Sequence, residues 1–175
     1  LLSKDVDLAI MYALADQSTL DSKGGDNSGA DSSAAFDSVP LGHDLLIPVC
    51  APSLQAASHT DSFPIIAYPA DVFLGHVFAS SIAPRIAQGV VVLPIAETAL
   101  TLAMVQLAIS EIGIAWLPMS LVAKSLASGD LVRANAALPT QALTIKMVRL
   151  HARQTDERQK IWNHLAQSLR VGPDL

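Results

Sequence analysis

Short apolar runs alternate with longer, partly polar stretches along most of the chain. The apolar runs are bounded by proline, glycine or polar residues, which predicts strands over residues 6–11, 44–51, 63–68, 89–93, 112–117, 131–133 and 143–150. Helical spacing between them predicts helices over residues 72–88 (broken or kinked at Pro84), 97–109 and 120–128, and a last helix that starts at Thr155. Alternating strands and helices indicate an α/β fold with largely parallel sheets.

The predicted helices carry recognisable end signals. Residues 97–109 have few polar side chains, so we expect most of this helix to be covered, with Glu97 in its first turn at the positive end of the helix dipole. Gly129 is placed to end the helix over residues 120–128, and Thr155 is a good N-cap. Residues 17–39 are crowded with Ser, Gly, Asp and Ala, have no periodicity, and are expected to form a surface loop.

Composition indicates a folded domain that does not itself bind DNA strongly. Apolar residues make up 51% of the 175 positions, which is ample for a core. No apolar run reaches the length of a membrane span, about 18 residues. The 11 Lys and Arg residues against 16 Asp and Glu residues give a net charge of −5, whereas a phosphate-binding surface needs a basic face.

The ends of the sequence and its cysteine usage bear on where the protein works. The single cysteine, Cys50, rules out an intrachain disulfide framework, and no secretory signal opens the chain, so we expect a cytoplasmic location. Leu1 is not a start methionine and a predicted strand follows almost at once. We therefore expect the sequence to be a part of a longer protein.

Ligands of α/β folds bind at the carboxyl ends of the strands, and residues at those ends are our candidates for ligand contact. They are Met11, Tyr12, Tyr68, Pro69, Asp71, Glu97, Thr98, Leu117 and Pro118. Backbone N–H groups at the start of the helix that opens with Glu97 could receive a carboxylate or another anion, although the charge of Glu97 would repel one. For each residue taken alone, ordinary packing or capping explains its presence equally well.

Side chains that often carry chemistry form no catalytic pattern here. Cys50 lies in an apolar strand, where a thiol is usually inert; redox sensing stays open, with His43 as the nearest partner in sequence. The methionines are either core residues or oxidation targets, and they are Met11, Met104, Met119 and Met147. The five histidines lack metal-ligand spacing and no nucleophile–base motif is present, so we expect no metal, no cofactor and no enzyme.

Three stretches, in this order, resemble the effector-binding domain of LysR-type transcription regulators. The first is Val-Asp-Leu-Ala-Ile at residues 6–10, and the second is His-Asp-Leu-Leu-Ile-Pro-Val-Cys-Ala-Pro at residues 43–52. The third covers residues 97–118 and ends Ile-Gly-Ile-Ala-Trp-Leu-Pro. The ordered set covers nearly the whole chain. Residues 43–52 and 68–75 are also similar to the hypochlorite-responsive branch of this family.

The resemblance implies the type II periplasmic-binding-protein fold, with two lobes and an interlobe cleft that holds a small-molecule effector. Lobe I, incomplete because its opening strand and helix are missing, would comprise residues 1–53 plus 151–175, and lobe II residues 54–150. The resemblance also implies a homo-oligomer, dimer or tetramer, that binds DNA only through a missing N-terminal helix-turn-helix domain, without membrane association. A periplasmic-type solute-binding protein is the alternative function.

One position departs from the family pattern. Glu111 stands where the family has a glycine before the strand over residues 112–117. If the backbone there is left-handed, glutamate costs about 1 kcal/mol relative to glycine. Otherwise the preceding helix ends in a different way.

Overall fold

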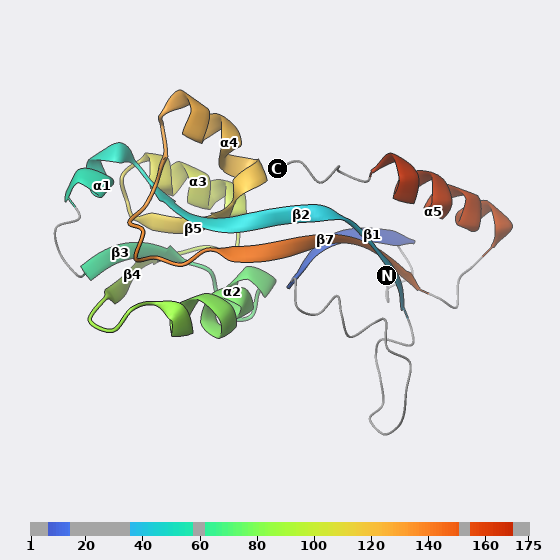
Figure 1. The fold of residues 1–175 in the computed structure, drawn as a ribbon, viewed down its shortest axis with the longest axis horizontal. Coiled ribbons are helices and arrows are strands. Elements are labelled where there is room, and N and C mark those ends of the chain that lie inside the picture. Colours follow the sequence, from blue (N-terminus) through green and yellow to red (C-terminus); the bar gives the residue numbers. More distant parts are fainter. Residues whose placement is uncertain (1–6, 15–35, 58–61, 151–154, 170–175) are drawn as a thin grey trace, which may run out of the picture. The chain divides into compact units, whose positions relative to one another are not determined.

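The computed structural model of the chain describes residues 7–14, 36–57, 62–150 and 155–169 (Figure 1). The chain forms two compact units. Unit 1 comprises Leu1–Asp44 and Ala142–Leu175, and unit 2 comprises Leu45–Gln141.

Two strands cross the boundary between the units along the chain. Strand β2 (Phe36–Cys50) begins in unit 1 and ends in unit 2, and strand β7 (Gln141–Leu150) begins at the last residue of unit 2. The sequence predicts lobe boundaries after residues 53 and 150. With those boundaries β2 would lie wholly in lobe I and β7 wholly in lobe II.

Unit 1 is built on an antiparallel pair of strands. Strand β1 (Leu8–Leu14) pairs with β7 along its whole length, from Leu8 opposite Arg149 to Leu14 opposite Leu143, and β7 also pairs with β2. Helix α5 (Asp156–Ser168) packs Trp162 against Leu41 of β2 and Met147 of β7. These three buried side chains form a hydrophobic cluster in unit 1.

Unit 2 contains the last part of β2, from Leu45 onwards, four further strands and several helices. In chain order these are α1 (Pro52–Ala57), β3 (Ser62–Ala67), α2 (Phe73–Val77), the π-helix η3 (Phe78–Ile82), the 3-10 helix η4 (Ala83–Arg85), β4 (Val91–Glu97), α3 (Thr101–Ile109), β5 (Ile114–Pro118), α4 (Met119–Ser128) and β6 (Val132–Arg133). The strand order is β2-β5-β3-β4, with β6 on β2. Every residue of β5 is buried: the strand lies between β2 and β3, and helices α3 and α4 also contact it.

The sheet is mixed. Strand β3 is parallel to β4 and to β5, as the alternating pattern predicts, whereas β2 is antiparallel to β5 and to β6. The reason lies in the topology. The chain leaves β2 through the short helix α1 and enters β3, which pairs with β5 and β4 and not with β2.

Both predicted helix ends are confirmed. Gly129 follows α4 with a φ of 83°, a left-handed conformation that glycine adopts without a steric penalty. The Thr155 side chain caps α5 by accepting a hydrogen bond from the Arg158 N–H. The predicted break near Pro84 is also present, since Pro84 lies in the 3-10 turn η4.

Glu111 has a φ of 65°, in the left-handed region. Among the described residues, no other residue except glycine has a positive φ. The left-handed alternative raised by the sequence is therefore correct. The Glu111 N–H donates to the Ala108 carbonyl and the Ile112 N–H donates to the Leu107 carbonyl, so this residue closes α3 as a glycine would.

The expected helix over residues 97–109 was wrong at its start. Glu97 is the last residue of β4, paired with Ala67 of β3, and α3 begins only at Thr101. A pairing between segments thirty residues apart decided this boundary over the local pattern. The expected coverage of the helix is confirmed, since Leu102 and Gln106 are the exposed residues among the nine of α3; Leu102 is 70% exposed.

Two other strands differ from the sequence expectation. Strand β1 runs on to Leu14, so Tyr12 lies inside it and not at its end. Strand β2 begins at Phe36, within the stretch 17–39 that was expected to be a loop; residues 17–35 lie outside the described residues. Among the described helices, none is both long and apolar enough to cross a membrane.

Candidate ligand-binding site

Seven of the nine candidate residues lie in unit 2, at the ends of β3, β4 and β5. Because β3 is parallel to both of its neighbours, the carboxyl ends of the three strands meet at one edge of the sheet. Ala67 pairs with Glu97, and the Thr98 N–H donates to the Ala67 carbonyl at 3.1 Å. The fold thus brings together the candidates of unit 2, which are Tyr68, Pro69, Asp71, Glu97, Thr98, Leu117 and Pro118.

Tyr68 holds this edge together. It directly follows β3, is 9% exposed, and its hydroxyl donates to the Trp116 carbonyl of β5 at 3.1 Å. The hydrogen bond fixes the end of one strand on the next. Asp71, three residues further on, is exposed to solvent.

The backbone after Tyr68 is tightly packed against α2. The Pro69 carbonyl accepts from the Val72 N–H, and a Cβ placed on Gly75 would lie 2.0 Å from the Pro69 oxygen. Any side chain at Gly75 would therefore push the start of α2 away from the end of β3. A lone glycine in an apolar helical stretch was the sequence signal for this close approach.

The residues at the end of β4 do not form the helix start that the sequence suggested. Glu97 is exposed and sits four residues before α3, so its charge does not occupy the first turn. The Thr98 Oγ1 accepts from the Leu100 N–H at 3.1 Å and turns the chain from β4 towards α3. Thr98 is half-buried and lies three residues before Thr101, the first residue of α3.

Leu117 and Pro118 at the end of β5 are both buried, and Leu117 is 0% exposed. Packing accounts for the Leu117 side chain in this unit. Pro118 also serves as the residue before the first turn of α4.

Met11 and Tyr12, the two candidates of unit 1, are neighbours on β1 and point to opposite faces of the sheet. Met11 is 49% exposed. The Tyr12 hydroxyl donates to the Asp44 Oδ2 at 2.9 Å, and Asp44 is 6% exposed. Asp44 is the last residue of unit 1 on β2, and its buried carboxylate was not anticipated from the sequence.

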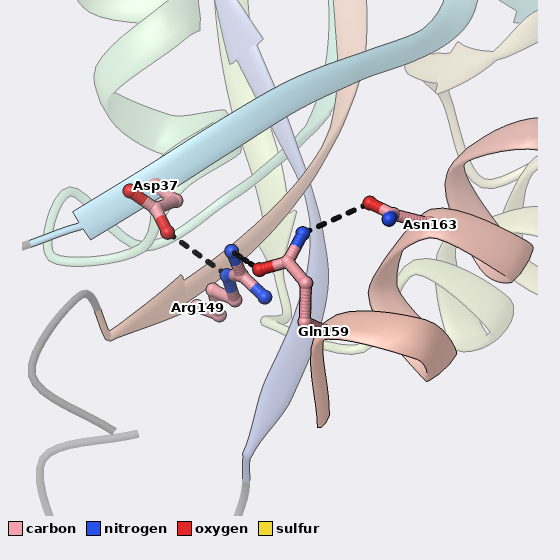
Figure 2. Close-up of polar contacts among 4 residues, drawn as sticks. All are labelled: Asp37, Arg149, Gln159 and Asn163. Carbon is pink, nitrogen blue, oxygen red and sulfur yellow. Dashed lines mark hydrogen bonds and ion pairs between the residues drawn. The ribbon is translucent and has the colours of Figure 1, made fainter. Parts of the chain in front are cut away.

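Figure 2 shows a second polar cluster of unit 1, centred on Arg149. The guanidinium donates to the Asp37 carboxylate at 2.9 Å and to the Gln159 Oε1 at 2.8 Å, and Gln159 donates to Asn163 at 2.9 Å. Arg149 is 8% exposed, so its charge is balanced inside the unit and not in water. The cluster joins β2, β7 and α5.

The cysteine lies in the core of unit 2. Cys50 is 1% exposed, and burial raises the pKa of its thiol because the thiolate would lose its hydration. Of the methionines, Met104 and Met147 are buried and Met119 is half-buried, which fits the packing alternative for these three. Met11 alone of the four is exposed.

The fold is of the type II periplasmic-binding-protein kind. The sequence pattern of the LysR substrate binding domain matches residues 1–170, and the chain belongs to this family. A search of curated proteins gave no match.

Solved structures of LysR-type regulators share the fold. Full-length HypT of Salmonella typhimurium, a hypochlorite-specific regulator, is 18% identical with a TM-score of 0.73 over 97% of this chain and 54% of its own. Vibrio fischeri DarR in complex with DNA is 19% identical with a TM-score of 0.68, over 95% of this chain and 52% of its own. Corynebacterium glutamicum LysG with bound effector Arg is 14% identical with a TM-score of 0.61, over 97% of this chain and 52% of its own. The chain therefore spans about half the length of these regulators.

Proposed function

We propose that the chain is the effector-sensing domain of a bacterial LysR-type transcription regulator. It binds a small molecule between two lobes, residues 1–53 plus 151–175 and residues 54–150, and so controls DNA binding by a helix-turn-helix domain elsewhere in the full-length protein. The observation that carries this proposal is the family match over residues 1–170. DarR with DNA and LysG with its effector supply examples of both activities on this fold.

In this proposal the effector contacts the nine residues predicted from the sequence, at the carboxyl ends of the strands. On unit 2, the exposed Asp71 and Glu97 and the half-buried Thr98 are the candidates whose polar side chains remain available at this edge. Tyr68 is buried and Leu117 is enclosed. A ligand that binds one arrangement of the domain better than another shifts the population between them, which is how occupancy would reach the DNA-binding domain.

A thermal-shift experiment tests the proposal. The chain is heated with a panel of amino acids and short carboxylic acids, arginine included. A ligand present at about 100 times its Kd should raise the Tm by about 5 to 10 °C. Asp71→Ala and Thr98→Val should reduce the shift, whereas Lys124→Ala, on the exposed side of α4, should retain it. A panel in which no compound moves the Tm contradicts effector sensing by this domain.

Homo-oligomerisation, as a dimer or tetramer, is the second part of the proposal. Five exposed apolar residues lie on β4, on α3 and at the residue before α3, and we call them the β4–α3 surface: Val91, Leu93, Ile95, Leu100 and Leu102, which are 49% to 70% exposed. Glu97 is the sole charged residue between positions 86 and 110. Exposed apolar side chains in a stretch with so little charge favour a protein partner, and a second copy is the partner that homo-oligomerisation supplies.

We further propose that the protein works in the cytoplasm without membrane association and has no enzymatic activity. The structural relatives described above are transcription regulators.

A further inference from the structure

The last residues of unit 2, Pro139–Gln141, lead directly into β7 and so into unit 1 (Figure 1). Two side chains from distant parts of unit 2 hold this segment. The Trp116 indole N–H donates to the Pro139 carbonyl at 2.9 Å. The Arg85 guanidinium donates to the Thr140 carbonyl at 2.8 Å and to the Gln141 Oε1 at 2.9 Å. Each residue of the segment is thus bound by one of two side chains.

Trp116 also connects to the candidate site. It is 1% exposed and stands on β5 immediately before Leu117. Its carbonyl accepts the hydrogen bond from Tyr68, while its indole N–H holds Pro139. One rigid, enclosed residue therefore contacts the end of β3 on one side and the segment before β7 on the other.

Arg85 reaches the candidate site by a second route. It ends a continuous helical stretch, Phe73–Arg85, whose first turn packs on the Pro69 carbonyl through Gly75. The Phe78 ring in the middle of this stretch meets the Trp116 ring edge-on, with 5.0 Å between the ring centroids. The middle of the stretch is a π-helix, a conformation that is rare and frequent at functional sites.

We infer that Pro139–Gln141 is the connection through which the candidate site of unit 2 acts on strand β7, with Trp116 and Arg85 as its two positioning residues. The inference rests on the proposed function, because it names how effector binding there is passed on. An effector that moves the end of β3 or the first turn of α2 moves Trp116 or the Phe73–Arg85 stretch. Trp116 holds Pro139, and Arg85 at the end of that stretch holds Thr140 and Gln141. Coupling of this kind acts equally in both directions.

Hydrogen exchange measured by mass spectrometry or NMR on the whole chain tests the inference without any effector. Arg85→Gln removes the guanidinium at an exposed position, and Trp116→Phe removes the indole N–H while keeping an aromatic ring. Each should speed exchange of the Val72 and His76 amides, which bond to the Pro69 and Val72 carbonyls, by about threefold or more. Lys124→Gln on α4 is the matched control and should leave these amides unchanged.

The reciprocal experiment perturbs the other end. Tyr68→Phe removes one hydroxyl at the candidate site and should speed exchange of the amides of residues 141–143 by a similar factor. The Tyr68→Phe/Arg85→Gln double variant should depart from the product of the single effects. Exchange that rises only beside each substitution, with multiplicative effects in the double variant, overturns the inference.

The two proposals fail separately. If each substitution speeds hydrogen exchange only beside itself, the connection through Pro139–Gln141 is wrong, and the proposal of effector sensing is unaffected. If no compound in the panel shifts the Tm, the proposed function is contradicted. The coupling between the two segments is still tested, because hydrogen exchange is measured on the unliganded chain.

Discussion

The Arg149 guanidinium carbon lies 4.3 Å from the centre of the Trp162 indole ring, while Asp37 approaches the same guanidinium from β2 at 2.9 Å. A buried charge is thus held between a carboxylate and an aromatic face. The aromatic contact fastens α5 to β7, whereas the ion pair joins β2 to β7. Trp162 is also the buried helix residue in the Leu41–Met147 cluster, against which Leu165 and Ala166 of α5 pack as well, so Trp162 is the centre of the helix's attachment.

We therefore predict that Trp162→Ala lowers the free energy of unfolding by about 3 to 5 kcal/mol, the usual cost of deleting a buried tryptophan side chain. The measurement is urea unfolding followed by circular dichroism. Ile161→Ala, at the neighbouring position with a 53% exposed side chain, is the matched control and should cost far less. Equal losses for the two variants would mean that Trp162 does not anchor the helix.

Glu111 provides a stabilising prediction. Its left-handed backbone costs glutamate about 1 kcal/mol relative to glycine, so Glu111→Gly should raise the free energy of unfolding by about that amount. Glu111→Gln removes the charge but keeps the Cβ, and it should give little or none of the gain. If both variants stabilise the protein equally, charge and not backbone conformation is the cause.

The β4–α3 surface gives a prediction about assembly. Leu102 is 70% exposed on α3, and Leu102→Lys should shift the chain towards smaller species in sedimentation velocity, because a buried lysine at an interface loses its hydration. Ala127→Lys introduces the same charge on the exposed side of α4 and should leave the distribution unchanged. A wild-type chain that sediments as a monomer at high concentration, or a Leu102→Lys variant identical to it, speaks against homo-oligomerisation through this surface.

Cys50 makes stability depend on alkaline pH. Burial raises the pKa of the folded thiol above its ordinary value of 9.0, so the folded state keeps a proton that the unfolded chain releases as pH rises. The contribution of this thiol to stability is complete below pH 9.0 and is lost as pH rises from there through the folded pKa. Urea unfolding between pH 7 and pH 10 under reducing conditions should show a decline that is shallower in Cys50→Ala.

Alkylation gives an independent check on the same thiol. Iodoacetamide reacts with the thiolate, so Cys50 should react slowly in the folded chain and quickly in denaturant. Fast labelling of the folded chain at neutral pH would contradict an inert thiol and would reopen redox sensing.

Local signals predicted the α/β alternation, the Thr155 cap and the Gly129 cap, because each depends on neighbouring residues. The end of β4 could not be read in this way: Glu97 looks like the start of a helix, and only its pairing with Ala67 makes it the end of a strand. Long-range pairing likewise placed Phe36 in a strand.

The same limit applies to the candidate site. Strand-end residues of unit 2 were found by rule, since parallel strands align their carboxyl ends. The contacts between these strand ends could not be predicted from the sequence. Tyr68 and Trp116 are 48 residues apart, and Arg85 and Gln141 are 56 residues apart. No pattern within either segment reveals such a partner.

Strand β2 continues without interruption from Phe36 to Cys50 and supplies structure to both units. Its first part belongs with β7 and its last part with β5 and β6. Neither unit is therefore an independent module, because a cut between Asp44 and Leu45 would divide strand β2 into two pieces, one in each unit. Cooperative unfolding of the whole chain in one transition is the natural result of such shared backbone.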